Sequence, residues 1–171
     1  GDILKQISKK EIVDDKFFSQ TKLDTLLEEI IENFEETSSK KITIVTKENK
    51  NKINFQRSPE LIYGLRNFIG NAVKFSKSKV EIILKSDTQQ IEILVNDNGP
   101  GFPDDVLEIL GEPYIKSKSK EVSNNAGTGM GTFLGKTLLE RKLARVFFSK
   151  DKNLGGASVK IIWELDKKTN F

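Results

Sequence analysis

The spacing of apolar residues along the chain predicts a sheet whose strands each have one buried face. Apolar and polar residues alternate over residues 41–49, 52–56, 79–86, 90–97, 144–150 and 157–165. This period of two is typical of half-buried β-strands. Short polar links predict that the first two strands form a hairpin and that the next two form another. The last two flank a turn through Gly155 and Gly156.

Apolar residues at helical spacing predict helices between these strands. The expected helices lie within residues 1–40 and over residues 59–76, 104–110 and 128–142. The first has apolar positions from Leu23 to Phe34 and a hydroxyl cap in the Thr21–Asp24 region, whereas Ser58 and Pro59 begin the second. Because each strand has a single apolar face, the helices should cover one face of a mixed, mostly antiparallel sheet. The expected fold class is a two-layer α/β sandwich.

Composition narrows the chemistry that the chain can perform. Its 171 residues include no Cys and no His, which excludes Ser-His and Cys-His triads and zinc sites built from imidazole or thiolate. A magnesium site is still possible, because magnesium prefers oxygen ligands, which the chain can supply. A net charge of +3 without clustered basic and aromatic residues argues against nucleic acid. No apolar run reaches the length of a membrane span or a signal peptide, so we expect an intracellular domain without membrane contact.

A stripe of polar residues on the helix after Pro59 is the first candidate site. Asn67, Asn71 and Lys74 follow one another at i, i+4 and i+7, so they share one helix face. A solvated helix face would explain this stripe as well. Asn is an indifferent helix former, however, and two aligned amides therefore indicate a ligand.

Two glycine-containing segments supply the other candidate residues. In Asp97-Asn98-Gly99-Pro100-Gly101-Phe102 a carboxylate ends an apolar strand, although the same residues also suit a tight turn. Gly127-Thr128-Gly129-Met130-Gly131 opens a helix whose free N–H groups suit phosphate, or it is a plain hinge. This second segment matches neither the GxxxxGK[ST] pattern nor a dinucleotide fingerprint in a βαβ unit.

The order of these motifs carries more information than any one of them. Asn67-x-x-x-Asn71-Ala72, DNGPGF, Glu112-Pro113-Tyr114 and GTGMG follow one another along the chain. In this order they resemble the ATP-binding catalytic domain of sensor histidine kinases, in the superfamily of the gyrase, Hsp90 and MutL ATPases. The resemblance covers residues 22 to 167 and implies a histidine kinase-type ATPase fold. GEPYIKSKS is similar to the RegB-like group of redox-responsive sensor kinases.

The resemblance assigns roles to the first two motifs. It implies ATP and Mg²⁺ as ligands, with Asn71 coordinating magnesium and with Asn67 and Lys74 reaching the phosphates. Asp97 would accept a hydrogen bond from the adenine amino group, where guanine instead has a carbonyl. Gly101 would line the same pocket. Phe75 and Gly99 complete the cofactor-binding residues of these two motifs.

The later motifs complete the expected nucleotide site. Tyr114 belongs to a phenylalanine-rich box that this chain keeps only in part. Residues 115–126 correspond to a lid that becomes ordered over the triphosphate, with Lys116 and Lys118 near its β- and γ-oxygens. The glycine-rich box supplies Gly127, Thr128, Gly129, Met130 and Gly131. Ala157 stands where the family commonly has Thr or Ser in a water-mediated adenine contact.

The resemblance also implies domains and partners. We expect residues 1–21 to be the tail of a dimerisation helix with its linker, and residues 22–171 to be the ATP-binding catalytic domain. The phosphoacceptor His and the general base would lie on the dimerisation domain, so no residue of this chain is assigned as catalytic. A homodimeric full-length protein at the inner membrane, with this domain in the cytoplasm, would pass phosphate to a response regulator.

Two alternatives stay open. The amide at Asn67 favours a kinase, because hydrolysing relatives carry Glu there to activate water. An anti-sigma-type serine kinase uses the same pocket without a dimerisation helix. The absence of His is also compatible with a nucleotide-sensing scaffold that transfers no phosphate.

Overall fold

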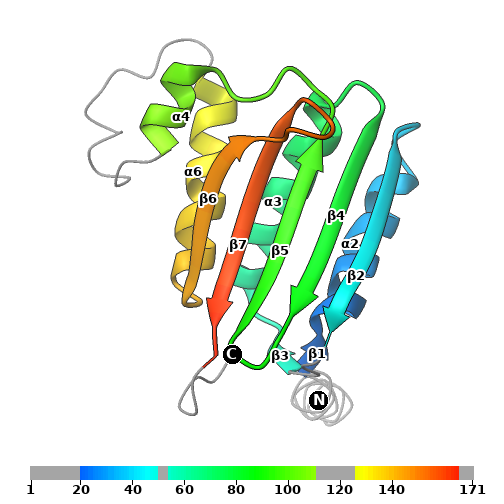
Figure 1. The fold of residues 1–171 in the computed structure, drawn as a ribbon, viewed down its shortest axis with the longest axis vertical. Helices are drawn as coiled ribbons and strands as arrows, with labels where there is room; N and C mark the ends of the chain where they lie inside the picture. Colours follow the sequence, from blue (N-terminus) through cyan, green and yellow to red (C-terminus); the bar gives the residue numbers. More distant parts are fainter. Residues whose placement is uncertain (1–19, 50–53, 111–125, 166–171) are drawn as a thin grey trace, which may run out of the picture.

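A five-stranded mixed sheet forms one layer of the domain (Figure 1). The structure is a computed structural model that describes residues 20–49, 54–110 and 126–165. The strands are β2 (Lys41–Asn49), β4 (Lys79–Ser86), β5 (Gln90–Asp97), β6 (Ala144–Lys150) and β7 (Ala157–Glu164). Their order is β2-β4-β5-β7-β6, in which β2 and β4 run parallel and every other pair is antiparallel.

Helices α2 (Leu23–Glu35), α3 (Pro59–Phe75) and α6 (Ala126–Glu140) cover one face of this sheet (Figure 1). The short helix α4 (Asp104–Leu110) contacts α6 and β6. The predicted two-layer α/β sandwich with a mostly antiparallel sheet is therefore confirmed. The hairpins of β4 with β5 and of β6 with β7 are confirmed as well.

The predicted hairpin between residues 41–49 and 52–56 is wrong. Strand β3 (Asn54–Gln56) pairs instead with β1 (Gln20–Lys22) in a separate two-stranded sheet, and β2 pairs in parallel with β4. Parallel neighbours need a long crossover, which α3 supplies here. Phe55 of β3 is buried with its ring centroid 5.1 Å from that of Trp163 on β7. This aromatic contact holds β3 beside the end of β7.

The start of α2 also differs from the prediction. Lys22 is the N-cap and makes no side-chain capping bond, so the predicted hydroxyl cap in the Thr21–Asp24 region is wrong. The backbone passes directly from β1 into α2, because pairing of β1 with β3 fixes the chain up to Lys22. A strand of three residues is too short to produce the alternation from which strands are predicted.

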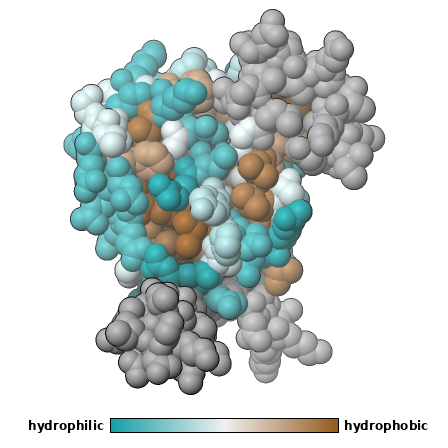
Figure 2. All heavy atoms as spheres, turned by 180° about the vertical axis from the view of Figure 1, so that it is seen from behind, coloured by the Kyte–Doolittle hydropathy of each residue, from teal (hydrophilic) through white to brown (hydrophobic). Residues whose placement is uncertain are grey.

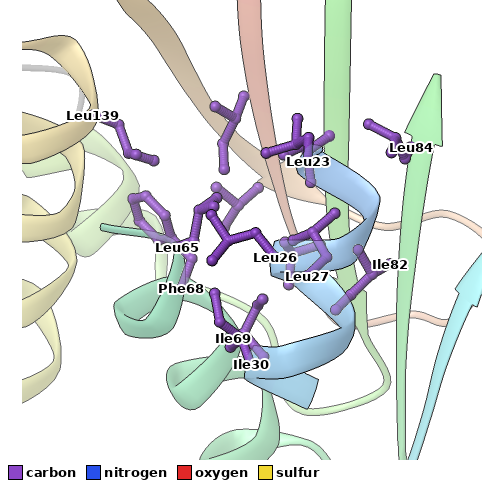
Figure 3. Close-up of a cluster of buried hydrophobic side chains, with 14 of the residues drawn as sticks. Leu23, Leu26, Leu27, Ile30, Leu65, Phe68, Ile69, Ile82, Leu84 and Leu139 are labelled. Carbon is purple, nitrogen blue, oxygen red and sulfur yellow. The ribbon is translucent and has the colours of Figure 1, made fainter. Parts of the chain in front are cut away.

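The hydrophobic core lies between the helices and the sheet. The Ser58 hydroxyl caps α3 as predicted by accepting a hydrogen bond from the Leu61 N–H at 3.2 Å. Figure 3 shows Leu26 and Leu27 of α2 beside Leu65 of α3 and near Ile82 of β4. These side chains are at most 1% exposed. Burying an aliphatic side chain of this size stabilises the fold by about 1.5–3 kcal/mol. The apolar face of α3 is therefore fixed against the sheet, and this sets the direction of the polar stripe on the same helix.

The helix side of the surface is mainly hydrophilic, with apolar patches between the polar residues (Figure 2). Exposed apolar residues on the helices include Tyr63 and Leu134, which are 60% and 53% exposed. Among the described residues, no helix combines the length and the apolar character that crossing a membrane requires.

Candidate nucleotide site

A cavity of about 680 Å³ opens where β5 ends and β7 begins. The last turns of α3 form one wall, and residues 100–106 form another. Its apolar lining includes Phe68, Ala72, Val95, Phe102, Val106 and Val159. Its polar lining includes Asn71, Lys74, Asp97, Asp104, Thr132 and Lys150. Apolar walls with a few converging polar groups are typical of a small-molecule site.

Asp97 is the buried carboxylate of this cavity, and its side chain is held by the backbone. The residue is 4% exposed, and its Oδ1 accepts hydrogen bonds from the Gly99 N–H at 2.8 Å and the Ala157 N–H at 3.2 Å. Within the ranges that the structure describes, Oδ2 has no hydrogen-bond partner. Burial raises the pKa of Asp97, and the two N–H groups counteract this only in part. The free oxygen is an acceptor positioned for a ligand's donor.

Two glycines make the close packing around Asp97 possible. A Cβ on Gly156 would lie 2.4 Å from Asp97 Oδ1 and 2.6 Å from the Gly99 nitrogen. A Cβ on Gly99 would lie 2.3 Å from the Phe75 carbonyl oxygen at the end of α3. The backbone groups that hold the Asp97 carboxylate, which we call its seat, can therefore approach this closely only if both positions are glycine. Gly99 was predicted as a site residue, whereas Gly156 was assigned only to a turn.

The polar stripe of α3 reaches the cavity in part. Asn71, Lys74 and Phe75 line it, as expected. The amide nitrogen Nδ2 of Asn71 donates to Thr132 Oγ1 at 3.1 Å and to Asn67 Oδ1 at 3.3 Å. These bonds leave the carbonyl oxygen Oδ1 of Asn71 without a protein donor among the described residues. Asn71 therefore presents an oxygen, which is the kind of ligand that magnesium takes.

Asn67 lies one turn away and does not line the cavity. Its side chain packs against α6, where a Cβ on Gly135 would lie 3.2 Å from Asn67 Oδ1. Its amide oxygen accepts the hydrogen bond from Asn71. The structure thus places Asn67 as a support of Asn71, at the contact between α3 and α6.

Positive charge lies at two sides of the cavity. Lys74 has no carboxylate partner in the described part of the chain, and its Nζ lies 5.3 Å from the centroid of the Phe75 ring. Lys150, at the end of β6, lies 3.7 Å from the carboxylate of Asp104, and both side chains are exposed. An exposed ion pair of this kind contributes at most about 1 kcal/mol. Lys74 is therefore the cation best placed to meet an anionic ligand.

The remaining predicted residues lie on α6 or outside the described ranges. Gly127, Thr128, Gly129, Met130 and Gly131 belong to the first turns of α6, which begins at Ala126 rather than at Thr128. Gly101, with φ of 81°, lines the cavity as expected. Tyr114, Lys116, Lys118 and the predicted lid up to residue 125 lie outside the described residues. The expected ordering of that lid stays a prediction.

Several lining residues were not predicted from the sequence. Thr132 follows the glycine-rich segment directly, so its position next to that motif was an available signal. Phe102 also had a signal in the sequence, because it ends the DNGPGF segment. Lys150 had no signal in the sequence, because it is one of many charged residues at the ends of strands. Only the pairing of β6 with β7 brings it to the cavity.

Comparison with known proteins agrees with this geometry. Residues 56–168 match the family described as histidine kinase-, DNA gyrase B-, and HSP90-like ATPase. The sensor histidine kinase RegB of Cereibacter sphaeroides is 36% identical over 126 residues, which cover 65% of this chain and 27% of RegB. The chain thus spans little more than a quarter of the length of this relative.

Solved structures share the fold. The mycobacterial sensor histidine kinase MprB aligns with a TM-score of 0.66 at 16% identity, covering 85% of this chain and 95% of that chain. Full-length ShkA in complex with AMPPNP aligns with a TM-score of 0.64 at 22% identity, covering 85% of this chain and 31% of that chain. The match over residues 56–168 and the shared fold confirm the predicted resemblance: this chain belongs to the histidine kinase-, DNA gyrase B-, and HSP90-like ATPase family and has the fold of histidine kinase catalytic domains.

Proposed function

We propose that this domain binds ATP with Mg²⁺ and donates the γ-phosphate to a histidine on a dimerisation domain outside the chain. The observation that carries the proposal is the free Oδ2 of Asp97 in an apolar cavity. A fixed carboxylate accepts a hydrogen bond from the amino group of adenine, whereas guanine has a carbonyl at that position. Apolar walls suit the faces of the base. The AMPPNP complex of ShkA supports an adenine nucleotide as the ligand.

Magnesium fits the site if the triphosphate supplies most of its ligands. The described residues contain no group of three or more acidic, His or Cys side chains that could hold a metal ion. Magnesium sites in phosphoryl-transfer enzymes use few protein ligands, because phosphate oxygens and water complete the octahedron. The free Oδ1 of Asn71 is the protein oxygen that we assign to it. The ion would neutralise charge on the transferring phosphoryl group.

The residues of this chain would act by positioning and by charge. Asp97 orients the base, Asn71 holds the metal, and Lys74 offsets negative charge on the phosphates. The chain has no His, so the acceptor imidazole must come from another segment or chain. We propose that residues 1–21 are the tail of the dimerisation helix and its linker, whose last residues enter β1. A homodimeric protein at the inner membrane, relaying phosphate to a response regulator, completes the proposal.

Transfer to histidine can be tested in trans. The domain is mixed with γ-labelled ATP, Mg²⁺ and a purified dimerisation domain of a sensor histidine kinase, with a His→Gln version of that acceptor as control. We expect acid-labile, alkali-stable label on the His-bearing acceptor and none on the control. Label on serine instead would favour a serine kinase. Binding of ATP without any transfer would favour a nucleotide-sensing scaffold.

The magnesium assignment predicts a metal-dependent defect at Asn71. Asn71→Ala should weaken ATP binding about tenfold or more in the presence of Mg²⁺, on the scale of one lost charge-assisted contact. With EDTA the two proteins should differ little, because the metal contact is then absent from both. Asn33→Ala, which removes an exposed amide on α2, is the matched control. Equal affinities of the Asn71 variant and wild type with Mg²⁺ would contradict the assignment.

A further inference from the structure

A lysine outside all the predicted motifs caps the helix that carries the nucleotide site. Lys40 lies between α2 and β2, and its Nζ donates hydrogen bonds to the Val73 carbonyl oxygen at 2.5 Å and to the Lys74 carbonyl oxygen at 3.1 Å. Both carbonyls belong to the last turn of α3, where backbone oxygens lack helical partners. A cation at this end also interacts favourably with the helix dipole. Lys40 thus fixes the C-terminus of α3.

The turn that Lys40 holds is the one that faces the cavity. Lys74 and Phe75 line the cavity from this turn. The Phe75 carbonyl lies so close to Gly99 that a Cβ there would come within 2.3 Å of its oxygen. The end of α3 therefore lies between Lys40 on one side and the loop that follows Asp97 on the other. A shift of this turn would move the cavity wall and the seat of the carboxylate together.

Lys40 also acts on Asp97 through its charge. Among the described residues Lys40 has no carboxylate within ion-pair distance, so its charge is not neutralised locally. It lowers the pKa of Asp97, but burial, the N–H groups of Gly99 and Ala157, and the charge of Asp151 all affect that pKa more strongly.

We propose that Lys40 is a positioning residue of the nucleotide site, which holds the last turn of α3, and with it the cavity wall that Lys74 and Phe75 form, in place for the nucleotide. It acts through α3 and does not itself line the cavity. The inference rests on the proposed binding of ATP at Asp97. It adds a residue from the α2–β2 connection to a site otherwise built from α3, β5, β7 and α6.

The charge and the hydrogen bonds of Lys40 can be separated by substitution. Lys40→Gln keeps a donor for the carbonyls of α3 and removes the charge, whereas Lys40→Arg keeps both. Lys40→Met removes both. Lys41→Met, which changes the neighbouring exposed lysine, is the matched control. The thermal melt of each variant, followed by the emission of the single Trp, shows whether it is folded.

The measurement is the dissociation constant of AMPPNP with Mg²⁺ from pH 5.5 to 8.5, expressed as the ratio of variant to wild type. The ratio cancels the titration of the nucleotide itself. Without a donor at position 40, the carbonyls of Val73 and Lys74 lose a partner, so the turn that forms the cavity wall is held less firmly. We expect Lys40→Met to bind AMPPNP about three- to tenfold more weakly than wild type at every pH, and Lys40→Gln, which keeps a donor, to show a smaller deficit. Lys40→Arg and Lys41→Met should bind like wild type.

The possible outcomes separate this inference from the proposed function. If wild type does not bind AMPPNP, the proposed function is wrong. If wild type binds and the folded Lys40→Met variant matches it at every pH, the inference about Lys40 is overturned. A deficit of Lys40→Arg as large as that of Lys40→Met would also overturn it, since Arg keeps both the donor and the charge at the end of α3.

Discussion

An Asp97→Asn variant is expected to bind ATP about 10- to 150-fold more weakly than wild type, because a charge-assisted hydrogen bond contributes about 1.5–3 kcal/mol. The carbonyl of Asn can still accept from the N–H groups of Gly99 and Ala157, so the seat of the side chain is kept. The charge and the free oxygen that would receive the adenine amino group are lost. Calorimetric titration with ATP measures the effect.

The same variant should be more stable than wild type at neutral pH when no nucleotide is present. Burial raises the pKa of Asp97 above its ordinary value, so the folded protein binds this proton more tightly than the unfolded chain does. Stability is therefore lost as the pH rises from the ordinary pKa through the raised one, and the ionised carboxylate destabilises the empty domain above that window. The neutral amide removes this cost. Thermal melts at pH 5 and pH 7 should show a smaller pH dependence for the variant.

Controls distinguish this effect from a general loss of charge. Asp105→Asn removes an exposed carboxylate on α4 and should change neither affinity nor the pH dependence of stability. GTP should compete poorly for the wild-type site. Equal competition by GTP, or unchanged ATP affinity of Asp97→Asn, would contradict adenine recognition by this residue.

The core was predictable because its periodicity is local. The inward positions of β7, such as Val159, Ile161 and Trp163, are buried as their alternation predicts. Strand pairing is not local, and here the prediction failed. The alternation over residues 41–49 predicts a strand but not the strand with which it pairs. That pairing depends on α3, which crosses from β2 to β4, and on Phe55, which packs on Trp163 and so places β3.

The site was predictable where a motif places residues close together in sequence. Asn71, Lys74 and Phe75 lie within two turns of one helix, so the stripe on α3 indicates their common direction. The bond from the Ala157 N–H to Asp97 joins residues 60 positions apart, and no local pattern predicts it. Lys40 is a similar case, because it reaches α3 from 33 residues away.

The second large effect is expected at Gly156. A methyl group there would lie 2.3 Å from the Asp97 carbonyl oxygen and 2.4 Å from its Oδ1, far inside van der Waals contact. Because Asp97 is part of a buried strand, neither group can move without breaking the bonds to Gly99 and Ala157. Gly156→Ala should therefore destabilise the domain by about 1–3 kcal/mol, as overpacking does, and should reduce ATP affinity at least as much as Asp97→Asn.

Gly155 provides the matched control, because a methyl group at this position meets no neighbouring atom, whereas one at Gly156 clashes with Asp97. It has a positive φ of 84°, and no atom lies within 4 Å of the place that a methyl group would take, so Gly155→Ala costs backbone strain of about 1–2 kcal/mol without a clash. Its ATP affinity should stay near that of wild type. Urea unfolding followed by Trp emission measures stability, and calorimetry measures affinity. If Gly156→Ala loses stability but binds ATP like wild type, the position of the Asp97 side chain is not what fixes the nucleotide.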